Sequence, residues 1–431
     1  MIRNFTALAL ALVMSAPALA QSAPPVTVIH AGVLIDKPGT PPRRNASVVI
    51  RGDRIEAVRD GFVEMPGATV VDLRNRTVLP GLIDSHVHLD SDAGGEAGLV
   101  EAVRSSDAAT AFRAAENGRK TLMAGFTTVR NLGDESGATL ALRDAIARGS
   151  QIGPRIVDAG RSISTTAGHM DGRTGLNDDI AHAIGDENLC DGVESCRHAV
   201  RLQIRRGVDV IKIATTGGVN SGTGRAKMIF DDETKALVET AQLYGRKVAV
   251  HAHGVAGVNA ALAAGANSIE HGTEMDDESI RLFKRTGAFY VPTLSTVNGY
   301  IERLEKNPNA YEPRTLAQIK WRIGVTGQSL RKAYPAGVRI AFGTDAGVSK
   351  HGKNAEEFES LVKNGMPPEA AIVAATVNAA ELLGLSADIG TLEAGKFADL
   401  VAVSGDPLTD VGVLKSIGFV MKGGLVVKDV R

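Results

Sequence analysis

The stretch Val248-Ala-Val-His-Ala-His253 is a β-rich run that ends in two histidines. A helical pattern from Val255 to Ala264 follows it, and a second β-rich run, Ser268-Ile-Glu-His271, comes next. Gly265 stands directly after the helical pattern, where a glycine suits the C-cap of a helix. A strand, a helix and a strand in this order are typical of proteins with parallel sheets. The unit therefore predicts an α/β fold.

The same alternation extends on both sides of this unit, over residues 81–385. Amphipathic stretches separate eight β-rich runs, at 82–88, 126–130, 155–158, 208–213, 248–253, 268–271, 289–293 and 339–345. Further helical patterns cover residues 194–206, 232–244 and 278–285. Eight alternations predict a (β/α)8 TIM barrel with insertions. A doubly wound open sheet is the alternative, but no GxGxxG turn follows the first run, which argues against a dinucleotide site.

Both ends of the chain are β-rich. Short alternating runs bounded by Gly, Pro and Asp fill residues 21–80, and similar runs return in residues 386–431. We therefore expect one small β-sandwich domain that is built from both termini around the barrel.

Composition limits the classes of partner. The chain has 431 residues, of which 44% are hydrophobic and 23% charged, and its formal net charge is -1. Such a chain is long enough for one large domain and a smaller one. It lacks the basic field that nucleic acids and anionic membrane surfaces require, so we expect neither partner.

The first twenty residues have the features of a signal peptide. Arg3 precedes an apolar run from Ala7 to Met14, and Ala18-Leu-Ala20 has the small-x-small pattern of a cleavage site. A short membrane anchor is the alternative, but the run is too short to cross a bilayer. We expect residues 1–20 to be removed and the protein to be periplasmic or secreted.

The chain has two cysteines, Cys190 and Cys196, so a disulfide framework is excluded as the source of its stability. In an exported chain the pair forms either one local loop staple or two idle thiols. Neither alternative places these cysteines at the reactive site.

Side chains that can bind metals fall at the ends of the predicted strands. These residues are His86, His88, His251, His271 and Asp345. In a barrel all such ends open on the face where active sites are built. Alternate residues of a strand point to one side, so His86 and His88 can reach the same metal ion. An HxH triplet alone is weak evidence, but together the five residues predict a metal site.

Lys212, in the fourth predicted strand, separates two mechanisms. It is either a barrel lysine paired with an acid or, as the family resemblance described next implies, a carbamate formed when its neutral amine adds carbon dioxide. A carbamate has two oxygens that can bridge two divalent ions at the ~3.5 to 4 Å spacing of two-metal hydrolases.

Five motifs resemble the amidohydrolase superfamily. They are Leu79-Pro-Gly-Leu-Ile-Asp-Ser-His-Val-His88, Gly125-Phe-Thr-Thr-Val-Arg130, Ile269-Glu-His-Gly272, Phe342-Gly-Thr-Asp-Ala-Gly347 and Gly390-Thr-Leu-Glu-Ala-Gly-Lys-Phe-Ala-Asp-Leu-Val401. The chain is most similar to the branch of Xaa-Pro dipeptidases and N-acyl-amino-acid carboxypeptidases, which includes amidohydrolases that cleave ochratoxin A at its phenylalanine amide.

The resemblance implies a set of metal ligands. It implies His86, His88 and Asp345 at one ion, His251 and His271 at the other, and carboxylated Lys212 as the bridge, most often over zinc. Either His251 or His253 could be the ligand in the fifth run. We expect His251, because the interval from His251 to His271 resembles the interval in the family.

The resemblance also implies substrate contacts. His253 stands where related dipeptidases often have a tyrosine that donates to the substrate carboxylate or the oxyanion. His169 resembles a loop histidine that lines the substrate pocket, and a surface histidine is the alternative. Arg161 and Arg130 could meet a substrate carboxylate, although barrel arginines commonly form structural ion pairs.

The function implied is hydrolysis of an amide bond next to an amino acid by hydroxide bridging two metal ions. Asp345 would act as general base and then general acid. Candidate substrates are a dipeptide, an N-acyl amino acid or an ochratoxin A-like phenylalanine amide. One rival is a mononuclear member of the superfamily, a deaminase or an imidazolone-type hydrolase, and another is a non-catalytic binding scaffold. Relatives imply a homo-oligomer, with an octamer as one assembly.

Overall fold

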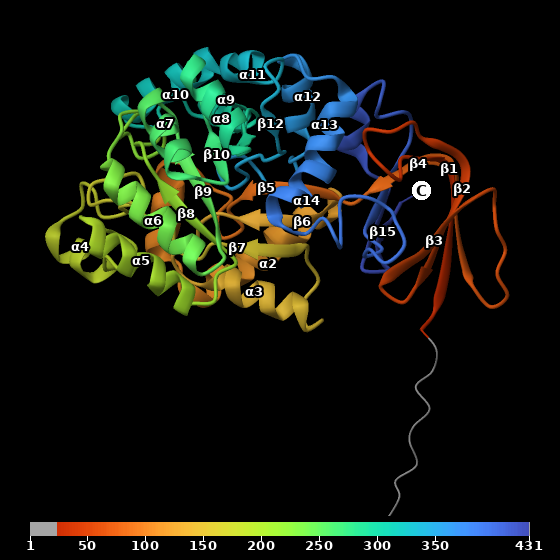
Figure 1. The fold of residues 1–431 in the computed structure, drawn as a ribbon. Helices are drawn as coiled ribbons and strands as arrows, with labels where there is room; N and C mark the ends of the chain where they lie inside the picture. The colour runs from red at the N-terminus through yellow and green to blue at the C-terminus, as the bar shows by residue number, and fades with distance from the viewer. Residues whose placement is uncertain (1–23, 431) are drawn as a thin grey trace, which may run out of the picture.

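The computed structural model describes residues 24–430 and contains a barrel beside a smaller β domain (Figure 1). The predicted signal peptide, residues 1–20, lies outside the described residues. Within residues 24–430, no helix is both long enough and apolar enough to cross a membrane.

Eight parallel strands form the barrel, in one sheet of three strands and one of five. They are β5 (Leu82–Val87), β6 (Phe126–Asn131), β7 (Arg155–Asp158), β8 (Val210–Ala214), β9 (Lys247–Ala252), β10 (Ser268–His271), β11 (Phe289–Val291) and β12 (Arg339–Ile340). Hydrogen bonds close both gaps between the sheets, because Ile163 N donates to Lys212 O and Ser85 N donates to Phe342 O. The eight predicted runs are therefore the eight strands of a (β/α)8 barrel.

Helices pack around these strands. They are α2 (Asp107–Met123), α3 (Ala138–Ala147), α5 (Val193–Arg205), α6 (Asp231–Leu243), α7 (Val255–Ala264), α8 (Asp277–Thr286), α12 (Glu356–Lys363), α13 (Pro368–Val373) and α14 (Ala379–Leu383), with a π-helical turn at Ala374–Asn378. The four predicted helices, which are α5 to α8, agree with the structure within one residue at each end. The remaining helices are α1 (Gly95–Arg104), α4 (Asp178–Ile184), and α9 (Thr296–Lys306), α10 (Pro313–Val325) and α11 (Gln328–Ala333) after β11.

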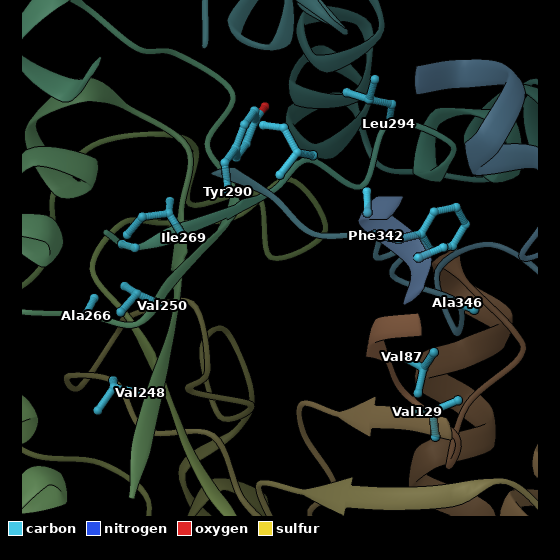
Figure 2. Packing of buried hydrophobic residues seen from close by; sticks show 14 of the residues in the cluster. Val87, Val129, Val248, Val250, Ala266, Ile269, Tyr290, Leu294, Phe342 and Ala346 are labelled. Carbon is cyan, nitrogen blue, oxygen red and sulfur yellow. The ribbon is translucent and has the colours of Figure 1, made fainter. Parts of the chain in front are cut away.

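Apolar side chains fill the barrel and the layer beneath its helices. Val87, Val129, Val250, Ile269 and Phe342 belong to one buried cluster (Figure 2). Burying this surface supplies the main favourable free energy of folding. It also gives the strand ends a rigid base.

The eighth run differs from its prediction as a single strand over residues 339–345. β12 ends at Ile340, and the backbone beyond it bonds to other segments. Phe342 N donates to Ala374 O, and Asp345 N donates to His86 O. Asp345 itself has a positive φ of 60°. The turn carries the Asp345 side chain toward β5.

The two ends of the chain form one seven-stranded mixed sheet in the order β15-β14-β13-β4-β1-β2-β3. Its strands are β1 (Val26–Leu34), β2 (Arg43–Arg51), β3 (Arg54–Asp60), β4 (Thr69–Pro80), β13 (Leu400–Val403), β14 (Phe419–Lys422) and β15 (Leu425–Asp429). Ile55 N donates to Lys396 O, so edge strand β3 meets the segment that leads into β13. The sheet thus closes over its own core, as predicted for a small sandwich built from both termini.

Gly81 alone separates β4 of the smaller domain from β5 of the barrel. A Cβ atom at this position would lie 2.1 Å from Thr127 Oγ1, so only glycine fits the close approach of β5 and β6. The first barrel strand is therefore a direct continuation of the β domain.

Candidate metal centre

Every residue that the sequence predicts as a metal ligand lines one cavity at the carboxyl ends of the barrel strands. We call it the inner cavity, and its volume is about 130 Å³. Its lining includes His86, His88, Lys212, His251, His271 and Asp345, together with His169 and His253. The barrel topology predicted this convergence, since these residues come from β5, β8, β9, β10 and the loops after the strands.

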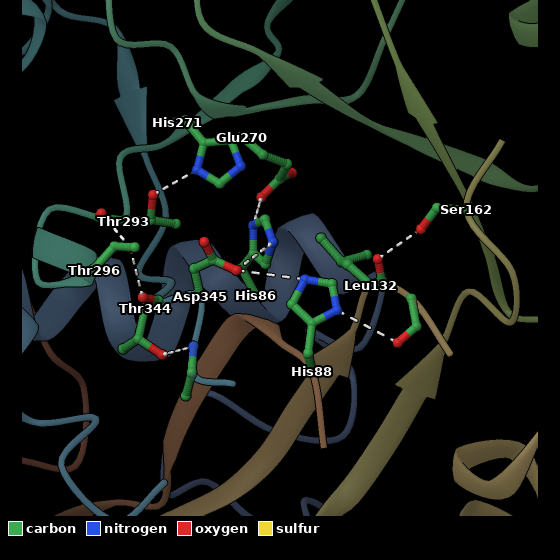
Figure 3. A network of polar contacts seen from close by, with 12 residues as sticks. His86, His88, Leu132, Ser162, Glu270, His271, Thr293, Thr296, Thr344 and Asp345 are labelled. Carbon is green, nitrogen blue, oxygen red and sulfur yellow. Dashed lines mark hydrogen bonds and ion pairs between the residues drawn. The ribbon is translucent and has the colours of Figure 1, made fainter. Parts of the chain in front are cut away.

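One group of ligand atoms consists of His86, His88 and Asp345, which lie within 4.8 Å of one another. Asp345 Oδ1 is 3.4 Å from His86 Nε2 and 3.4 Å from His88 Nε2 (Figure 3). Two imidazoles and a carboxylate that converge in this way are a donor set for a divalent transition metal.

A second group consists of His251, His253 and His271, again within 4.8 Å. The ring centroids of His251 and His271 are 4.6 Å apart, and those of His253 and His271 are 4.9 Å apart. Both His251 and His253 therefore belong to the second group, and these distances do not decide which of the two would bind the metal.

A buried ion pair orients His86. Its Nδ1 donates to Glu270 Oε2 at 2.9 Å, and Arg130 Nη2 donates to Glu270 Oε1 at 2.8 Å. Burial alone would raise the pKa of Glu270, but the Arg130 guanidinium and the His86 hydrogen bond hold it at about 2. The carboxylate thus fixes the His86 tautomer that leaves Nε2 free for a metal. No sequence pattern indicates this role of Glu270, although the residue directly precedes His271 in the motif Ile269-Glu-His-Gly272.

Backbone carbonyls and a hydroxyl orient the other imidazoles. His251 Nε2 donates to Gly217 O at 3.1 Å, and His88 Nδ1 donates to Gly133 O at 3.4 Å. His271 Nδ1 lies 2.8 Å from the Thr293 hydroxyl (Figure 3). Among the described residues, Nδ1 of His251 and Nε2 of His271 have no hydrogen-bond partner, and Nε2 of His88 faces only the Asp345 carboxylate at 3.4 Å.

Asp84 positions the first group of candidate ligands through hydrogen bonds. It is fully buried and accepts hydrogen bonds from Thr344 Oγ1 at 2.6 Å and from Asn354 Nδ2 at 2.8 Å. Its Oδ1 also accepts from His86 N at 3.1 Å. Asp84 thus links β5 to the turn that carries Asp345. No sequence pattern indicates this role beyond the position of Asp84 in the first motif.

Lys212 lines the inner cavity together with both groups. Its side chain is buried, and Nζ forms no hydrogen bond or ion pair with any residue in the described part of the chain. Burial lowers the pKa of Lys212 to about 8, against the attraction of Glu270 and Asp345. Among the described residues, Lys212 therefore forms no ion pair with an acid.

His169 reaches the inner cavity from the loop after β7. Its ring stacks on His251 with centroids 4.0 Å apart, and its Nδ1 lies 2.8 Å from the Ser221 hydroxyl. Gly218 makes room, since a Cβ there would lie 2.1 Å from the imidazole. The pocket position expected for His169 is found, and its role toward a substrate stays a prediction.

The two arginines singled out in the sequence do not face the inner cavity. Arg130 is bonded to Glu270, as described above. Arg161 donates from Nε to Glu135 O at 2.8 Å and from Nη1 to Glu187 Oε2 at 2.6 Å. Both arginines therefore form structural ion pairs, the alternative that the sequence left open, and the structure does not bring Arg161 to the site. Arg322 of α10 does line the inner cavity, and its position was not predicted because no sequence motif marks that helix.

A larger space adjoins the inner cavity, and we call it the outer cavity. Its volume is about 750 Å³, and His88, Met170, Asn220 and Val348 line both spaces. Four acids contribute to its lining: Asp90, Asp134, Glu135 and Glu312. A substrate that reaches the metal groups through this space passes these four acidic side chains.

Cys190 and Cys196 form a disulfide, so the loop-staple alternative is the one found. Cys190 N donates to Ser164 O, and Asn188 Nδ2 donates to Ser162 O and Met170 O. The bonded segment thus supports the loop that carries His169, although neither sulfur lines the inner cavity.

Comparison with known proteins relates this geometry to one family. The model of the amidohydrolase family matches residues 77–427. Ochratoxinase from Aspergillus niger is 34% identical over 426 residues, which cover 94% of this chain and 87% of that protein.

Solved structures give the same relation. A Xaa-Pro dipeptidase with methionine bound in its active site has a TM-score of 0.89 at 39% identity, covering 94% of this chain and all of that one. A prolidase in complex with N-methylphosphonate-L-proline has a TM-score of 0.85 at 32% identity, with 94% and 100% coverage.

Proposed function

Because this chain belongs to the amidohydrolase family and is a hydrolase of amide bonds, we propose that it is a binuclear metal enzyme that cleaves the amide next to an amino acid. One observation carries the proposal. Two groups of three candidate ligands line one cavity together with a buried lysine, and this lysine has no hydrogen-bond or ion-pair partner among the described residues. A mononuclear site would not need that lysine.

The donor set fits two divalent ions. His86, His88 and Asp345 would hold one ion, and His251 and His271 would hold the other. Lys212, converted to a carbamate, would supply the anionic bridge, and its lowered pKa increases the fraction of neutral amine that can react with carbon dioxide. Imidazole and carboxylate donors suit zinc. Bound there, the ions would polarise the scissile carbonyl. They would also lower the pKa of water to about 7, so that hydroxide is available as the nucleophile at neutral pH.

Asp345 is placed to move the proton. Although burial alone would raise its pKa, the neighbouring histidines hold it at about 2, so the group is a carboxylate at neutral pH. Its Oδ1 lies at the centre of the first group and can accept a proton from attacking water. The same atom can then donate that proton to the leaving amine.

Histidines beyond the ligand set would orient the substrate. His253 is fixed through Nδ1, which lies 2.7 Å from the Thr273 hydroxyl, and its other nitrogen has no hydrogen-bond partner among the described residues. His169 stands at the border of the two cavities. Either imidazole can donate to the carbonyl oxygen as charge develops on it.

The relatives support amino-acid amides as substrates. One is an ochratoxinase, one is a Xaa-Pro dipeptidase with bound methionine, and one is a prolidase with a proline phosphonate. We propose dipeptides or N-acyl amino acids as the substrate class, with ochratoxin-like phenylalanine amides included in it.

Metal content and hydrolysis test this function together. Wild type should hold two metal ions per chain and hydrolyse an N-acyl-phenylalanine or a Xaa-Pro dipeptide. Lys212→Ala should lose metal and activity. Lys247→Ala is a matched control, because Lys247 also lies on a barrel strand but donates to the carbonyls of Glu381 and Leu382, away from the site. One metal per chain and an active Lys212→Ala variant would instead support the mononuclear alternative.

Export is part of the same proposal. Residues 1–20 have the signal-peptide pattern, and disulfides such as Cys190–Cys196 persist in oxidising compartments. Cell fractionation tests this, and retention of residues 1–20 on a cytoplasmic protein would contradict it. Homo-oligomer assembly stays a prediction, which light scattering on the purified protein would test.

A further inference from the structure

His351 is a buried histidine close to the first group of candidate ligands. It follows Asp345 in the segment that leads from β12 into α12, and its residue surface is 6% exposed. It lines neither the inner cavity nor the outer cavity. The function proposed above does not use it.

Both ring nitrogens of His351 form hydrogen bonds. Nε2 lies 3.0 Å from His88 O and 3.0 Å from Ser91 O, and Nδ1 lies 3.2 Å from the Thr121 hydroxyl. Carbonyl oxygens only accept hydrogen bonds, so Nε2 carries the proton and Nδ1 accepts from Thr121. The ring therefore joins the loop after β5 to helix α2 in one fixed orientation.

Two further hydrogen bonds hold the same loop. The backbone N–H of His351 donates to Asp92 Oδ1 at 3.0 Å, and Asn117 Nδ2 donates to Leu89 O at 2.9 Å. Asn117 and Thr121 lie on one face of α2, because residues one helical turn apart are neighbours. A loop beyond a strand end has no sheet partner, so its buried carbonyls depend on such side chains. His351 differs from the two helix residues because it comes from the segment beyond β12.

This segment holds the backbone of His88 at two atoms. His88 N donates to Ala346 O at 2.7 Å, and His88 O accepts from His351 Nε2. A Cβ atom at Gly347 would lie 2.8 Å from His88 O, so glycine is needed for this close approach. The segment that supplies Asp345 therefore also fixes the peptide groups of a second ligand of the same ion.

His88 depends on this backbone support more than the other two ligands of the first group do. Its side chain is 26% exposed, against 1% for His86 and 10% for Asp345. The hydrogen bond that orients its ring, from Nδ1 to Gly133 O, is 3.4 Å long, whereas the corresponding bond of His86 is 2.9 Å long. The His88 ring is held weakly through its own side chain, so its position depends on its backbone.

We propose that His351 is a positioning residue that determines how tightly the ion of the first group is bound. By holding the His88 carbonyl, it fixes His88 relative to Asp345, so both ligands keep the spacing that one ion requires. The inference rests on the proposed function and adds a residue to its metal centre. Groups that orient metal ligands from outside the ligand set commonly contribute about 10- to 100-fold to metal affinity.

Chelator titration of the zinc-loaded protein tests this role without catalysis. His351→Leu removes the ring hydrogen bonds and should raise the dissociation constant of one ion by about 10- to 100-fold, while the other ion stays bound as in wild type. His351→Gln should recover part of the affinity, because its amide can donate to the carbonyls and accept from Thr121.

A second ligand variant shows which ion is loosened. His88→Asn should lose the ion of the first group. His88→Asn/His351→Leu should then hold its remaining ion as tightly as His88→Asn does, because His351 acts through His88. Loosening of this remaining ion by His351→Leu would contradict the assignment to the first group.

His30→Leu is the matched control. His30 is also buried, at 8% exposed, and its Nε2 donates to Val63 O at 2.9 Å in the β domain, far along the chain from the metal groups. This variant should have a lower melting temperature, as His351→Leu should, but it should keep both ions at wild-type affinity. Equal loosening of an ion in both variants would mean that His351 acts only through overall stability, and would overturn the inference.

Thr121→Val tests the same contact without changing His351. It removes the hydroxyl that donates to Nδ1, so it should loosen the same ion by less than His351→Leu does. Thermal melts show whether each variant folds. A folded His351→Leu protein with wild-type affinity for both ions would overturn the inference. If His351→Leu does not fold, unchanged zinc affinity in Thr121→Val would overturn it.

Hydrolysis separates this inference from the function on which it rests. Excess zinc should restore the kcat of His351→Leu for an N-acyl-phenylalanine, because the ligands themselves are intact. Wild-type hydrolysis with unchanged zinc affinity in His351→Leu would reject the role of His351 alone. A loosened ion in His351→Leu, with no amide hydrolysis by wild type, would reject the proposed function and keep the role of His351.

Discussion

His251 and His253 differ in the ring nitrogen that faces the cavity. His251 lies within β9 and donates from Nε2 to Gly217 O, so its Nδ1 is free. His253 lies beyond the strand end, and its Nδ1 contacts the Thr273 hydroxyl. A ligand needs a fixed position, and the strand backbone fixes His251 more firmly than the loop fixes His253. We therefore expect His251 to be the ligand, which is also the residue that the interval in the sequence favours.

Metal content of two asparagine variants tests this assignment. His251→Asn should lose about one metal ion per chain, because it removes an imidazole donor from the second group. His253→Asn should keep its metal and lose about 100-fold in kcat, as expected for removal of a donor to the oxyanion. Elemental analysis and hydrolysis of an N-acyl-phenylalanine give both values. Equal metal loss in the two variants would show that both histidines are ligands.

The sequence predicts the histidines of the site but not the groups that orient them. His86, His251 and His271 end strand runs, so periodicity alone places them on one face. The Glu270 carboxylate joins His86 on β5 to Arg130 on β6, and this contact exists only after three strands have packed. Sequence patterns do not predict contacts between side chains on distant strands. The position of Arg322 at the cavity was not predicted for the same reason.

Among the secondary-structure elements, α5 to α8 were predicted within one residue at each end because their apolar periodicity and terminal glycines agree. The short strand β12 was predicted too long. Its sequence is apolar up to Phe342, but the hydrogen bonds of the following residues go to other segments. Helices α9 to α11, which follow β11, carry Tyr300 and Arg322 to the inner cavity, and amphipathic patterns do not reveal which helix covers a site.

The disulfide stabilises the loop after β7. Cys190 and Cys196 are six positions apart, and the segment before them bonds to the backbone around His169. Closing a ring this small restricts the unfolded chain by about 2 kcal/mol. The bond should therefore stabilise both the fold and the position of His169.

Removing both cysteines should show this effect. The variant Cys190→Ala/Cys196→Ala should melt at a lower temperature, in line with a loss of about 2 kcal/mol, and should keep its metal ions. Its kcat/KM should fall because His169 is less well held. Thermal melts of wild type with and without a thiol reductant give the comparison, and the variant should not respond to the reductant. An unchanged melting temperature would mean that the surrounding hydrogen bonds suffice.

For the whole molecule, charge differs between the two ends of the substrate path. Arg322 lines the inner cavity, whereas Asp90, Asp134, Glu135 and Glu312 line the outer cavity. Asp134 is used within the protein, since its carboxylate accepts from Ser136 and Thr139. Glu135 lies beside Arg161, and burial raises the pKa of Asp90 and of Glu135 to about 7, so both acids are only partly ionised at neutral pH. The field of the ionised acids extends over a Debye length of roughly 10 Å at 0.1 M salt. A substrate with a carboxylate at one end and a cation at the other matches this path.

An unblocked dipeptide should therefore be a better substrate than its N-acetylated form. The free α-amino group is positive at neutral pH and would lie in the outer cavity, so its kcat/KM should be higher by about 3- to 10-fold and should decline with salt. The double variant Glu135→Gln/Glu312→Gln should reduce this preference. Glu305→Gln is the control, because Glu305 lies on α9 outside both cavities. Equal rates for the two substrates at low salt would mean that the acids only solvate the opening, and N-acyl amino acids would then fit the site as well as dipeptides do.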